Sequence, residues 1–463
     1  MTMTCEPSDI RGKAGTGSVL SLDAIGRQEA FLLGPDSFFK FDPKRHTNFT
    51  SYQSSIRIRK PAPVTSQGVG VNPQTVLNWP FGQTIVIDDQ LKPQSMGDLL
   101  KNIYMKCTLP FLDDSVQLGS KYCDQVGRAI VKTITFTVDG IEVEKIYSDW
   151  NVIRDQLFTT DEEKVGLQYL VNGGQPEGTL PTSNVKAGPI DLFVPMNFFF
   201  SNNDSTFFPL CAILNQKIKI VIEFNPVSFF SDTHTKDLYP DTNTECSLPF
   251  FDIVFDQVAL TPDERLYLQS VNHKLLIETV RRQPTLEIPP GTLRIKNYLV
   301  PNIPVETFHW FFRRSVLENA LTTDAAIIFN RYNFSSNVSS DINVQSQYPV
   351  LSDAKFFING QSQLGFLEDG AQNRPQTSYY FKYVEAMSAN LSAPTRNVYT
   401  YSFALDPMHE PLTGAMDFSQ LIADKTFIDT SILASANTDT YLMHMYYTGL
   451  VTLTFSGGFM KVL

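Results

Sequence analysis

The stretches Phe136-Thr-Val-Asp-Gly140 and Phe356-Phe-Ile-Asn-Gly360 decide the fold of this chain. Each ends an alternating apolar run at an Asp-Gly or Asn-Gly pair, and another strand-like segment follows directly. Such pairs between alternating runs predict a β-hairpin, because both central residues of the turn need positive φ. Gly360 follows Gly140 by 220 residues. The two hairpins therefore suggest that one structural unit occurs twice.

A second pair of similar segments supports the duplication. Ile190-Asp-Leu-Phe-Val-Pro-Met196 corresponds to Tyr401-Ser-Phe-Ala-Leu-Asp-Pro-Met408, and the two Pro-Met pairs lie 212 residues apart. Similar offsets at separate landmarks indicate an internal repeat. We infer a unit of just over 200 residues, on the order of a large β-domain, in two copies.

Composition agrees with two large β-domains. The chain has 463 residues, of which 42% are hydrophobic and only 18% charged, so it can fill two cores but offers little for long solvated helices. Its 35 Phe residues suit the space between the sheets of a β-sandwich. Short apolar runs bounded by Pro, Gly, Asn or Asp recur along the chain and predict an antiparallel sandwich or barrel. The predicted strands cover residues 53–60, 84–88, 102–109, 129–138, 190–200, 216–224, 250–260, 274–280, 292–300, 307–312, 325–334, 354–358, 398–405 and 440–463.

Helical patterns are few. One is predicted over residues 148–157, and the clearest helix start is Thr261-Pro-Asp-Glu264, with Thr as N-cap and Pro at the first helical position. This second helix lies at the midpoint of the duplication and is expected to link the two copies. Residues 166–188 are polar and contain Gly and Pro, so we predict a surface loop there.

Charge and cysteine content narrow the class of protein. A net charge of −11 argues against a nucleic-acid surface, which is normally basic. The basic clusters at residues 44–46 and 56–60 are interpreted as a solvated strand face. The five cysteines have no C-x-x-C pair, which favours a reducing compartment. The first 20 residues lack the apolar region of a signal peptide, and no run reaches the 18 or so apolar residues of a membrane span. We expect a soluble protein made in the cytosol.

No pattern of catalytic, cofactor-binding or metal-binding residues is found. The six histidines show no metal-ligand spacing and are expected to be packed or surface residues: His46, His234, His273, His309, His409 and His444. Three acidic pairs are expected to be solvated: Asp113-Asp114, Glu162-Glu163 and Asp263-Glu264. Five Asn-x-Ser/Thr sites are expected to stay unmodified: Asn48, Asn203, Asn333, Asn337 and Asn390. The prediction is therefore a protein that is not an enzyme, with no cofactor and no metal.

Several motifs resemble a known family in its order along the chain. Ile25-Gly-Arg-Gln-Glu-Ala-Phe-Leu32, Phe38-Phe-Lys40 and Arg45-His-Thr-Asn-Phe49 are similar to the opening of the major capsid proteins of nucleocytoplasmic large DNA viruses. The resemblance continues through Pro262-Asp-Glu-Arg265, Phe357-Ile-Asn-Gly360 and Val398-Tyr-Thr-Tyr-Ser-Phe-Ala-Leu405, and ends at Gly457-Gly458. Asp417 stands where the family usually has Asn. Marseillevirus-like members, which infect amoebae, are the suggested lineage.

The resemblance implies an all-β fold of two tandem eight-stranded antiparallel jelly-roll sandwiches, a double jelly-roll. The expected organisation is a flexible arm (1–25), a first jelly-roll domain (26–260), a linker helix (261–271) and a second jelly-roll domain (272–463). Three subunits would form a pseudo-hexagonal capsomer that tiles an icosahedral shell. Insertions at residues 166–188, 228–247 and 366–378 would project outward.

The same resemblance sets the expected partners. These are further copies of the chain, neighbouring capsomers, minor capsid and penton proteins, and an inner membrane reached by the arm. The expected location is the virion capsid, after synthesis and assembly in the host cytoplasm. Two alternatives stay open: a transient assembly scaffold of the same fold, and a β-sandwich enzyme or glycan-binding protein. The second would need clustered acids and exposed aromatic rings, whereas Trp79, Trp150 and Trp310 are scattered.

Overall fold

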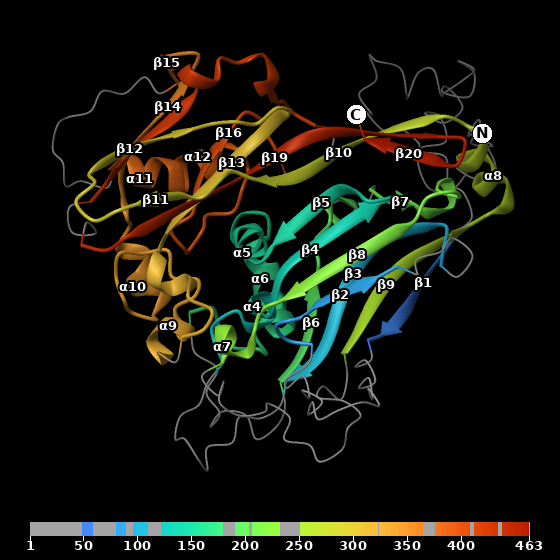
Figure 1. Ribbon diagram of the computed structural model, residues 1–463, viewed down its shortest axis with the longest axis horizontal. Coiled ribbons are helices and arrows are strands. Elements are labelled where there is room, and N and C mark those ends of the chain that lie inside the picture. The colour runs from blue at the N-terminus through green and yellow to red at the C-terminus, as the bar shows by residue number, and fades with distance from the viewer. Residues whose placement is uncertain are drawn as a thin grey trace, which may run out of the picture. The chain divides into compact units, whose positions relative to one another are not determined.

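Both predicted hairpins form in the computed structural model (Figure 1). Strands β4 (Val131–Val138) and β5 (Ile141–Tyr147) are joined at Asp139 and Gly140, which have φ of 52° and 82°. Strands β14 (Leu351–Ile358) and β15 (Gln361–Ser362) are joined at Asn359 and Gly360, with φ of 50° and 82°. Positive φ at both central residues is the type I′ geometry that the Asp-Gly and Asn-Gly pairs predict.

The structure describes most of the chain after residue 48. The described ranges are 49–58, 80–88, 96–109, 122–178, 190–202, 206–231, 251–322, 324–363, 376–407, 412–433 and 438–462. Residues Thr50–Leu463 form one compact unit. The predicted arm, residues 1–25, lies outside the described residues, as do most of the predicted insertions at 228–247 and 366–378.

The first half of the chain forms two antiparallel sheets. One has the order β1 (Phe49–Arg57), β9 (Phe251–Leu260), β3 (Leu99–Leu109) and β6 (Ile190–Pro195), with the short β7 (Phe208–Pro209) paired to β3. The other has the order β2 (Thr84–Ile87), β8 (Ile218–Phe224), β4 and β5. Apart from the β4–β5 hairpin, neighbouring strands come from distant parts of the chain, so each sheet depends on long-range pairing.

The second half repeats this arrangement. One sheet has the order β10 (His273–Arg282), β19 (Tyr441–Ser456), β13 (Pro304–Arg314) and β16 (Tyr399–Ser402). The other has the order β12 (Arg294–Tyr298), β18 (Phe427–Ile432), β14 and β15. Three short strands join the first of these sheets: β11 (Leu286–Ile288), β17 (Met416–Asp417) and β20 (Phe459–Val462).

The predicted duplication is therefore present in three dimensions. Strand β6 holds Ile190–Pro195 of the first similar segment, and β16 ends at Ser402, two residues into the second. Both strands occupy the same terminal position of equivalent sheets. Each hairpin turn also donates a backbone bond to the neighbouring strand connection: the Asp139 amide donates to the Lys217 carbonyl at 2.7 Å, and the Gly360 amide donates to the Lys425 carbonyl at 2.8 Å. Because the short extra strands add to the four-strand paths, the count of eight strands per half stays a prediction.

Alternating side chains fill the cores as expected. In β8 every second residue is buried, from Ile218 to Phe224. Phe136 packs against the rings of Phe198, Phe200 and Phe208, at centroid distances between 4.9 and 5.8 Å. In the second half, the ring of Phe308 lies close to those of Phe356, Phe403, Phe418 and Tyr447. The many Phe side chains of the sequence thus help to fill the space between the sheets.

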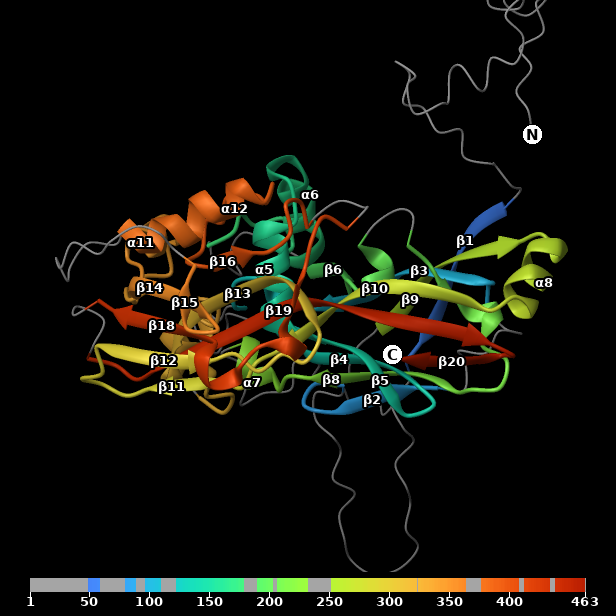
Figure 2. The same cartoon turned by 90° about the horizontal axis from the view of Figure 1, so that it is seen from above.

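Helices connect the strands and cover their ends (Figure 2). The predicted helix at residues 148–157 is α5 (Ser148–Leu157), and the predicted linker helix is α8 (Pro262–Ser270). The Thr261 side chain does not cap an α8 amide; its hydroxyl lies 3.3 Å from a Glu264 carboxylate oxygen. The other α-helices of the described residues are α4 (Val126–Ile130), α6 (Asp161–Val171), α7 (Val227–Phe230), α9 (Ala325–Phe329), α10 (Ile342–Gln347), α11 (Gln376–Tyr379) and α12 (Glu385–Ser388).

Two sequence predictions are wrong. Residues 166–171 were predicted as loop but complete helix α6, because Thr160 and Glu163 form a capping box upstream and Val171 is buried. Residues 325–334 were predicted as a strand, but they form α9 followed by turns. The Asp324 carboxylate accepts a bond from the Ala326 amide at 2.9 Å, and this N-cap selects the helix. Within the described ranges, no helix is long and apolar enough to cross a membrane.

Candidate functional site

Helix α5 occupies the junction between the two halves (Figures 1 and 2). It follows β5 directly, and seven of its ten residues are buried. A surface helix buries one stripe, whereas a helix buried on most sides lies between layers. The Trp150 ring lies 5.6 Å from that of His309 and 6.0 Å from that of Tyr446, both on second-half strands. Helix α5 therefore continues from the first half and packs against the second half.

One cluster of charges at this junction centres on Arg313 of β13. Its guanidinium donates to both carboxylate oxygens of Asp149 on α5, at 2.7 and 3.0 Å, and to Glu318 at 2.7 Å. The same Glu318 oxygen lies beside Nε2 of His444. Burial acts to raise the pKa of Asp149 and of Glu318, but the charge and hydrogen bonds of Arg313 outweigh it and lower both pKa values. Both carboxyls are therefore held ionised.

A second cluster centres on Arg396. Its guanidinium bonds to Glu177 at 2.6 Å and to Asp124 at 2.5 Å, both in the first half. Burial acts to lower the pKa of Arg396, but the two carboxylates outweigh it and raise that pKa. The side-chain Oε1 of Gln156 on α5 accepts bonds from the backbone amides of Thr395 and Arg396, at 2.9 and 3.1 Å. Second-half residues are thus tied to first-half residues by paired charges and by hydrogen bonds.

A third arginine stays within the first half. Arg128 of α4 donates to both oxygens of Asp155 at 2.8 Å, and this pair anchors α5 to its own half.

A further arginine crosses the junction: Arg331 of the second half donates to the backbone carbonyl of Phe229 in the first half, at 2.9 Å. Buried charges are tolerated only when paired and fully hydrogen-bonded, so these clusters impose a defined geometry on the junction.

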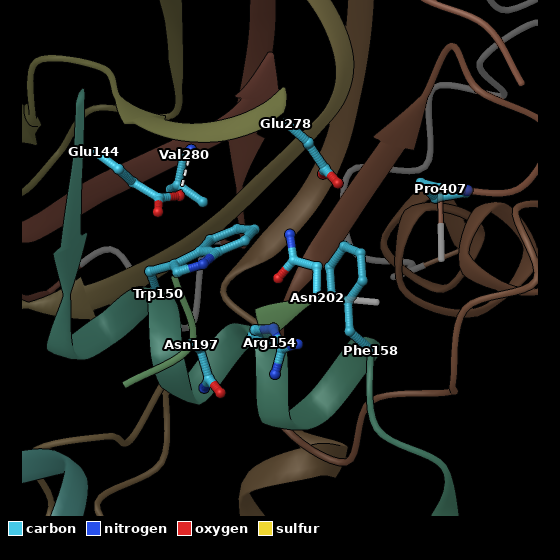
Figure 3. Close-up of a pocket in the computed structure, with 9 residues that line it drawn as sticks. All are labelled: Glu144, Trp150, Arg154, Phe158, Asn197, Asn202, Glu278, Val280 and Pro407. Carbon is cyan, nitrogen blue, oxygen red and sulfur yellow. Dashed lines mark hydrogen bonds between the residues drawn. The ribbon is translucent and has the colours of Figure 1, made fainter. Parts of the chain in front are cut away.

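A small cavity lies beside α5, between the two halves (Figure 3). Its volume is about 60 Å³. The Glu144 carboxylate accepts bonds from the amides of Phe199, at 2.8 Å, and Val280, at 3.4 Å, so this residue also links the halves. The lining residues are Glu144, Trp150, Arg154, Phe158, Asn197, Asn202, Glu278, Val280 and Pro407.

The acids at this cavity have unusual protonation. Burial raises the pKa of Glu144 to about 8 and that of Glu278 to about 7. Nearby on β13, burial and repulsion from Glu278 raise the pKa of Glu306 to about 8, and its buried Oε2 makes no hydrogen bond within the described part of the chain. Burial also lowers the pKa of Arg154. These acids titrate near neutral pH, unlike the ionised carboxyls of the Arg313 cluster.

The size of the cavity limits its chemistry. Ligand and substrate pockets measure roughly 300–1,000 Å³, whereas a buried water needs only roughly 10–15 Å³. A cavity of about 60 Å³ thus suits a few waters and is too small for an organic substrate. The raised carboxyl pKa values follow from burial at the junction and do not by themselves indicate an acid–base catalyst.

The histidines that the structure describes are packed, and none lies at a metal site. His309 is fully buried with Thr307 and Thr400 beside its ring nitrogens, at 2.8 and 3.0 Å, and burial lowers its pKa to about 3. His273 stacks on Phe455. Among the described residues, no group of three His, Cys, Asp or Glu side chains could hold a metal ion. His46, His234 and His409 lie outside the described residues.

The acidic pairs and Asn sites take structural positions where the structure describes them. Glu163 completes the α6 capping box, and Asp263 and Glu264 lie in the first turn of α8. Asn333 is buried and bonded to the Asn337 carbonyl at 2.8 Å, whereas Asn390 is exposed. Asn48, Asn203 and the pair Asp113-Asp114 lie outside the described residues.

The junction residues were missed by sequence reasoning. Asp149 and Arg313 stand 164 positions apart, and Asp124 and Arg396 stand 272 apart. No local spacing relates them. The sequence offers one indirect sign of a buried ion pair. Arg313 ends an apolar run, and a charged residue at the end of a buried strand needs a partner of opposite charge.

Two sequence families match this chain. Residues 37–248 match the family described as major capsid protein N-terminus, and residues 264–449 match the family described as large eukaryotic DNA virus major capsid protein. The chain belongs to the major capsid proteins of large eukaryotic DNA viruses. This confirms the resemblance found in the sequence, and it is a family of structural capsid proteins.

Curated relatives agree. The chain is 26% identical over 311 residues to capsid protein 1 of Acanthamoeba polyphaga mimivirus, covering 64% of this chain and 48% of that protein. It is 26% identical over 268 residues to the major capsid protein of Pyramimonas orientalis virus, covering 57% and 58%. The chain thus spans about half the length of the curated relatives it matches.

Solved capsid proteins show the same fold. The capsid protein VP54 of PBCV-1, as fitted into a reconstruction of the virophage Sputnik, gives a TM-score of 0.66 at 18% identity, covering 92% of this chain and 99% of that one. The Faustovirus major capsid protein gives 0.64 at 11% identity, covering 90% and 92%. Both are double jelly-roll proteins. At these identities the likeness concerns the fold alone, and it confirms the predicted double jelly-roll.

Proposed function

We propose that this chain is a structural major capsid protein whose homotrimer forms a pseudo-hexagonal capsomer in the icosahedral shell of a large DNA virus. One observation carries the proposal: the same strand order occurs twice in one chain, and α5 joins both halves. Most soluble oligomers close with point-group symmetry. Three copies around one axis would therefore present six similar sandwiches, and such an outline can tile a surface.

The junction supports this proposal. A pseudo-hexagonal outline requires the two sandwiches of a subunit to keep a constant mutual orientation. Two arginine clusters, Arg313 with Asp149 and Glu318, and Arg396 with Asp124 and Glu177, cross the junction and depend on its geometry. Breaking such buried pairs costs about 3–5 kcal/mol, so the halves are not free to hinge.

The domain organisation is part of the proposal. We assign residues 1–25 to an arm, 26–260 to the first jelly-roll domain, 261–271 to the linker helix and 272–463 to the second jelly-roll domain. The similar sheets of the two halves and the position of α8 between β9 and β10 support these boundaries.

The proposed partners follow from the family. They are further copies of the chain in the capsomer, neighbouring capsomers, minor capsid and penton proteins, and an inner membrane contacted through the arm. The proposed site of assembly is the host cytoplasm, and the final location is the virion capsid. We propose no catalytic role, since the described cavity beside α5 is too small for an organic substrate.

The native mass tests the capsomer. Light scattering of the purified chain at sub-micromolar concentration should give three times 52.1 kDa, stable on dilution. A stable monomer would overturn the capsomer proposal. Quantification of the chain in purified virions then separates a shell subunit, which is abundant there, from a transient scaffold, which is absent.

A further inference from the structure

Helix α6 exposes an apolar face that is largely uncovered in the described part of its own chain, where the Tyr169 ring borders Gly174. Val165 and Tyr169, one helical turn apart, are 64% and 65% exposed. Gly166 lies beside them, and a Cβ added there would meet no atom within 4 Å. We call Val165, Gly166 and Tyr169 the α6 face. Residues three and four apart share one side of a helix, so these three form one surface.

This helix is weak by itself. It has 11 residues and only Val171 is buried. Isolated helices shorter than about 12–15 residues are marginal in water, and an internal Gly costs about 1 kcal/mol relative to Ala. A glycine on a helix surface also allows the close approach of another backbone. The α6 face therefore has the composition of a packing surface.

The second half has a corresponding surface. It lies on the helical segment that follows the second hairpin, as α5 and α6 follow the first. Val384, which directly precedes α12, and Met387 within α12 lie three residues apart and are 46% and 58% exposed. We call them the α12 face. Figure 2 shows α6, α11 and α12 on the same side of the sheets.

The other sides of these two insertions already meet within the chain. Ser392, just beyond α12, donates from its amide to the Leu157 carbonyl and from its hydroxyl to the Thr159 carbonyl, both at 2.8 Å. Thr159 is two residues before α6. Each insertion thus uses one side against the insertion of the other half, and leaves the α6 face and the α12 face outside that contact.

We propose that the α6 face of one copy packs against the α12 face of the next copy in the capsomer. This inference rests on the proposed trimer. In a closed ring of three subunits, each half has two neighbours, one in its own chain and one in the next. Because the halves are equivalent in fold, the contact between chains repeats the pairing of insertions seen within the chain. We assign the α6 face and the α12 face to that second contact.

Charged substitutions test the contact. Val165→Glu and Met387→Glu each place a charge in the proposed interface, so the mass at sub-micromolar concentration should fall from three times to one times 52.1 kDa. Leu266→Glu on α8 is the matched control, because Leu266 is 63% exposed on a helix outside both faces. This control should stay trimeric.

Cross-linking provides a second measurement that does not depend on disrupting the trimer. The double variant Val165→Cys/Met387→Cys, treated with a short bis-maleimide, should give a covalent trimer on a denaturing gel. Either single variant should not, because the proposed contact joins different faces. The described native cysteines, Cys107, Cys123 and Cys211, are buried, and Cys5 and Cys246, which lie outside the described residues, are replaced by Ser in all these variants.

The outcomes distinguish the two proposals. A trimeric wild type whose glutamate variants stay trimeric, or whose cysteine pair forms no bond between chains, would overturn the contact and leave the capsomer standing. A monomeric wild type would overturn both. If the glutamate variants fail to fold, the cysteine pair alone decides.

Discussion

Arg313 and Asp149 form a bidentate ion pair at 2.7 and 3.0 Å that joins β13 of the second half to α5 of the first half. Both side chains are largely buried. Glu318 and His444 complete the cluster on the second-half side. A planar guanidinium that makes two parallel hydrogen bonds to one carboxylate fixes both the distance and the angle between the groups. The pair therefore fixes the relative orientation of the two halves in addition to holding them together.

Substitution of Arg313 should be severely destabilising. Arg313→Met leaves the largely buried Asp149 and the half-buried Glu318 without their cation, and we expect a loss of about 3–5 kcal/mol in the free energy of unfolding. Denaturant titration measures it. Lys132→Ala is the matched control, since its pair with Glu223 is exposed and should contribute less than about 1 kcal/mol. Equal losses for both variants would contradict the role of the buried cluster.

The acids at the cavity predict a pH dependence. The folded-state pKa of Glu144 is about 8, raised from 4.5. A carboxyl whose pKa is raised in the folded state binds its proton more tightly there than in the unfolded state. The contribution of Glu144 to folding stability is therefore complete below about pH 4.5 and is lost progressively as the pH rises to about 8. The Arg313 cluster has the opposite pH dependence. Because the pKa values of its carboxyls are lowered in the folded state, its contribution to stability is present at neutral pH and is lost only when the pH falls into the acid range.

The variant Glu144→Gln isolates this effect. Between pH 5 and pH 8 the melting temperature of the variant should decline less with rising pH than that of the wild type, because only the wild type loses the Glu144 contribution. Glu278 and Glu306 act in the same direction as Glu144, whereas His309, whose pKa is lowered by burial, acts in the opposite direction. Glu162→Gln, an exposed α6 position, should keep the wild-type slope. An unchanged slope in Glu144→Gln would mean that Glu144 does not titrate in this range.

Substitution of the glycine in either hairpin turn should lower stability by a similar amount, because both glycines have positive φ. Gly140 and Gly360 both have φ of 82°, and a Cβ at Gly140 would meet no atom. Gly140→Ala should therefore cost about 1–2 kcal/mol through backbone strain alone, and Gly360→Ala a similar amount. Asp139→Asn should be nearly neutral, because Asn tolerates the left-handed region. Thermal unfolding checks all three, and a neutral Gly140→Ala would exclude the type I′ turn.

The Phe136 ring cluster predicts a large core effect. Phe136 is fully buried among Phe198, Phe200 and Phe208, so Phe136→Ala should cost about 3–5 kcal/mol. Phe459→Ala on β20 removes the same ring from a position that is 47% exposed, and should cost far less. Comparison of the two denaturation midpoints tests whether burial, rather than the aromatic ring itself, sets the cost.

Local sequence signals determined much of the fold. The Asp-Gly and Asn-Gly pairs set both hairpins, because only residues that accept positive φ fit a type I′ turn. Alternation in segments such as Ile218–Phe224 determined strands with one buried face, because successive side chains in a strand point to opposite faces. The spacing of the repeats then revealed the duplication. Each of these signals acts over a few residues, so it can be seen in the sequence alone.

Only the tertiary structure decided the rest. The run at residues 325–334 has the apolar pattern of a strand, but it ends in a turn in which Arg331 donates to the Phe229 carbonyl of the other half. The pairing of Asp149 with Arg313 crosses 164 positions, and the raised pKa of Glu144 arises from burial between two halves. Such effects depend on which distant segments meet and exclude water. No local pattern encodes that, because burial and ion pairing are properties of the folded junction.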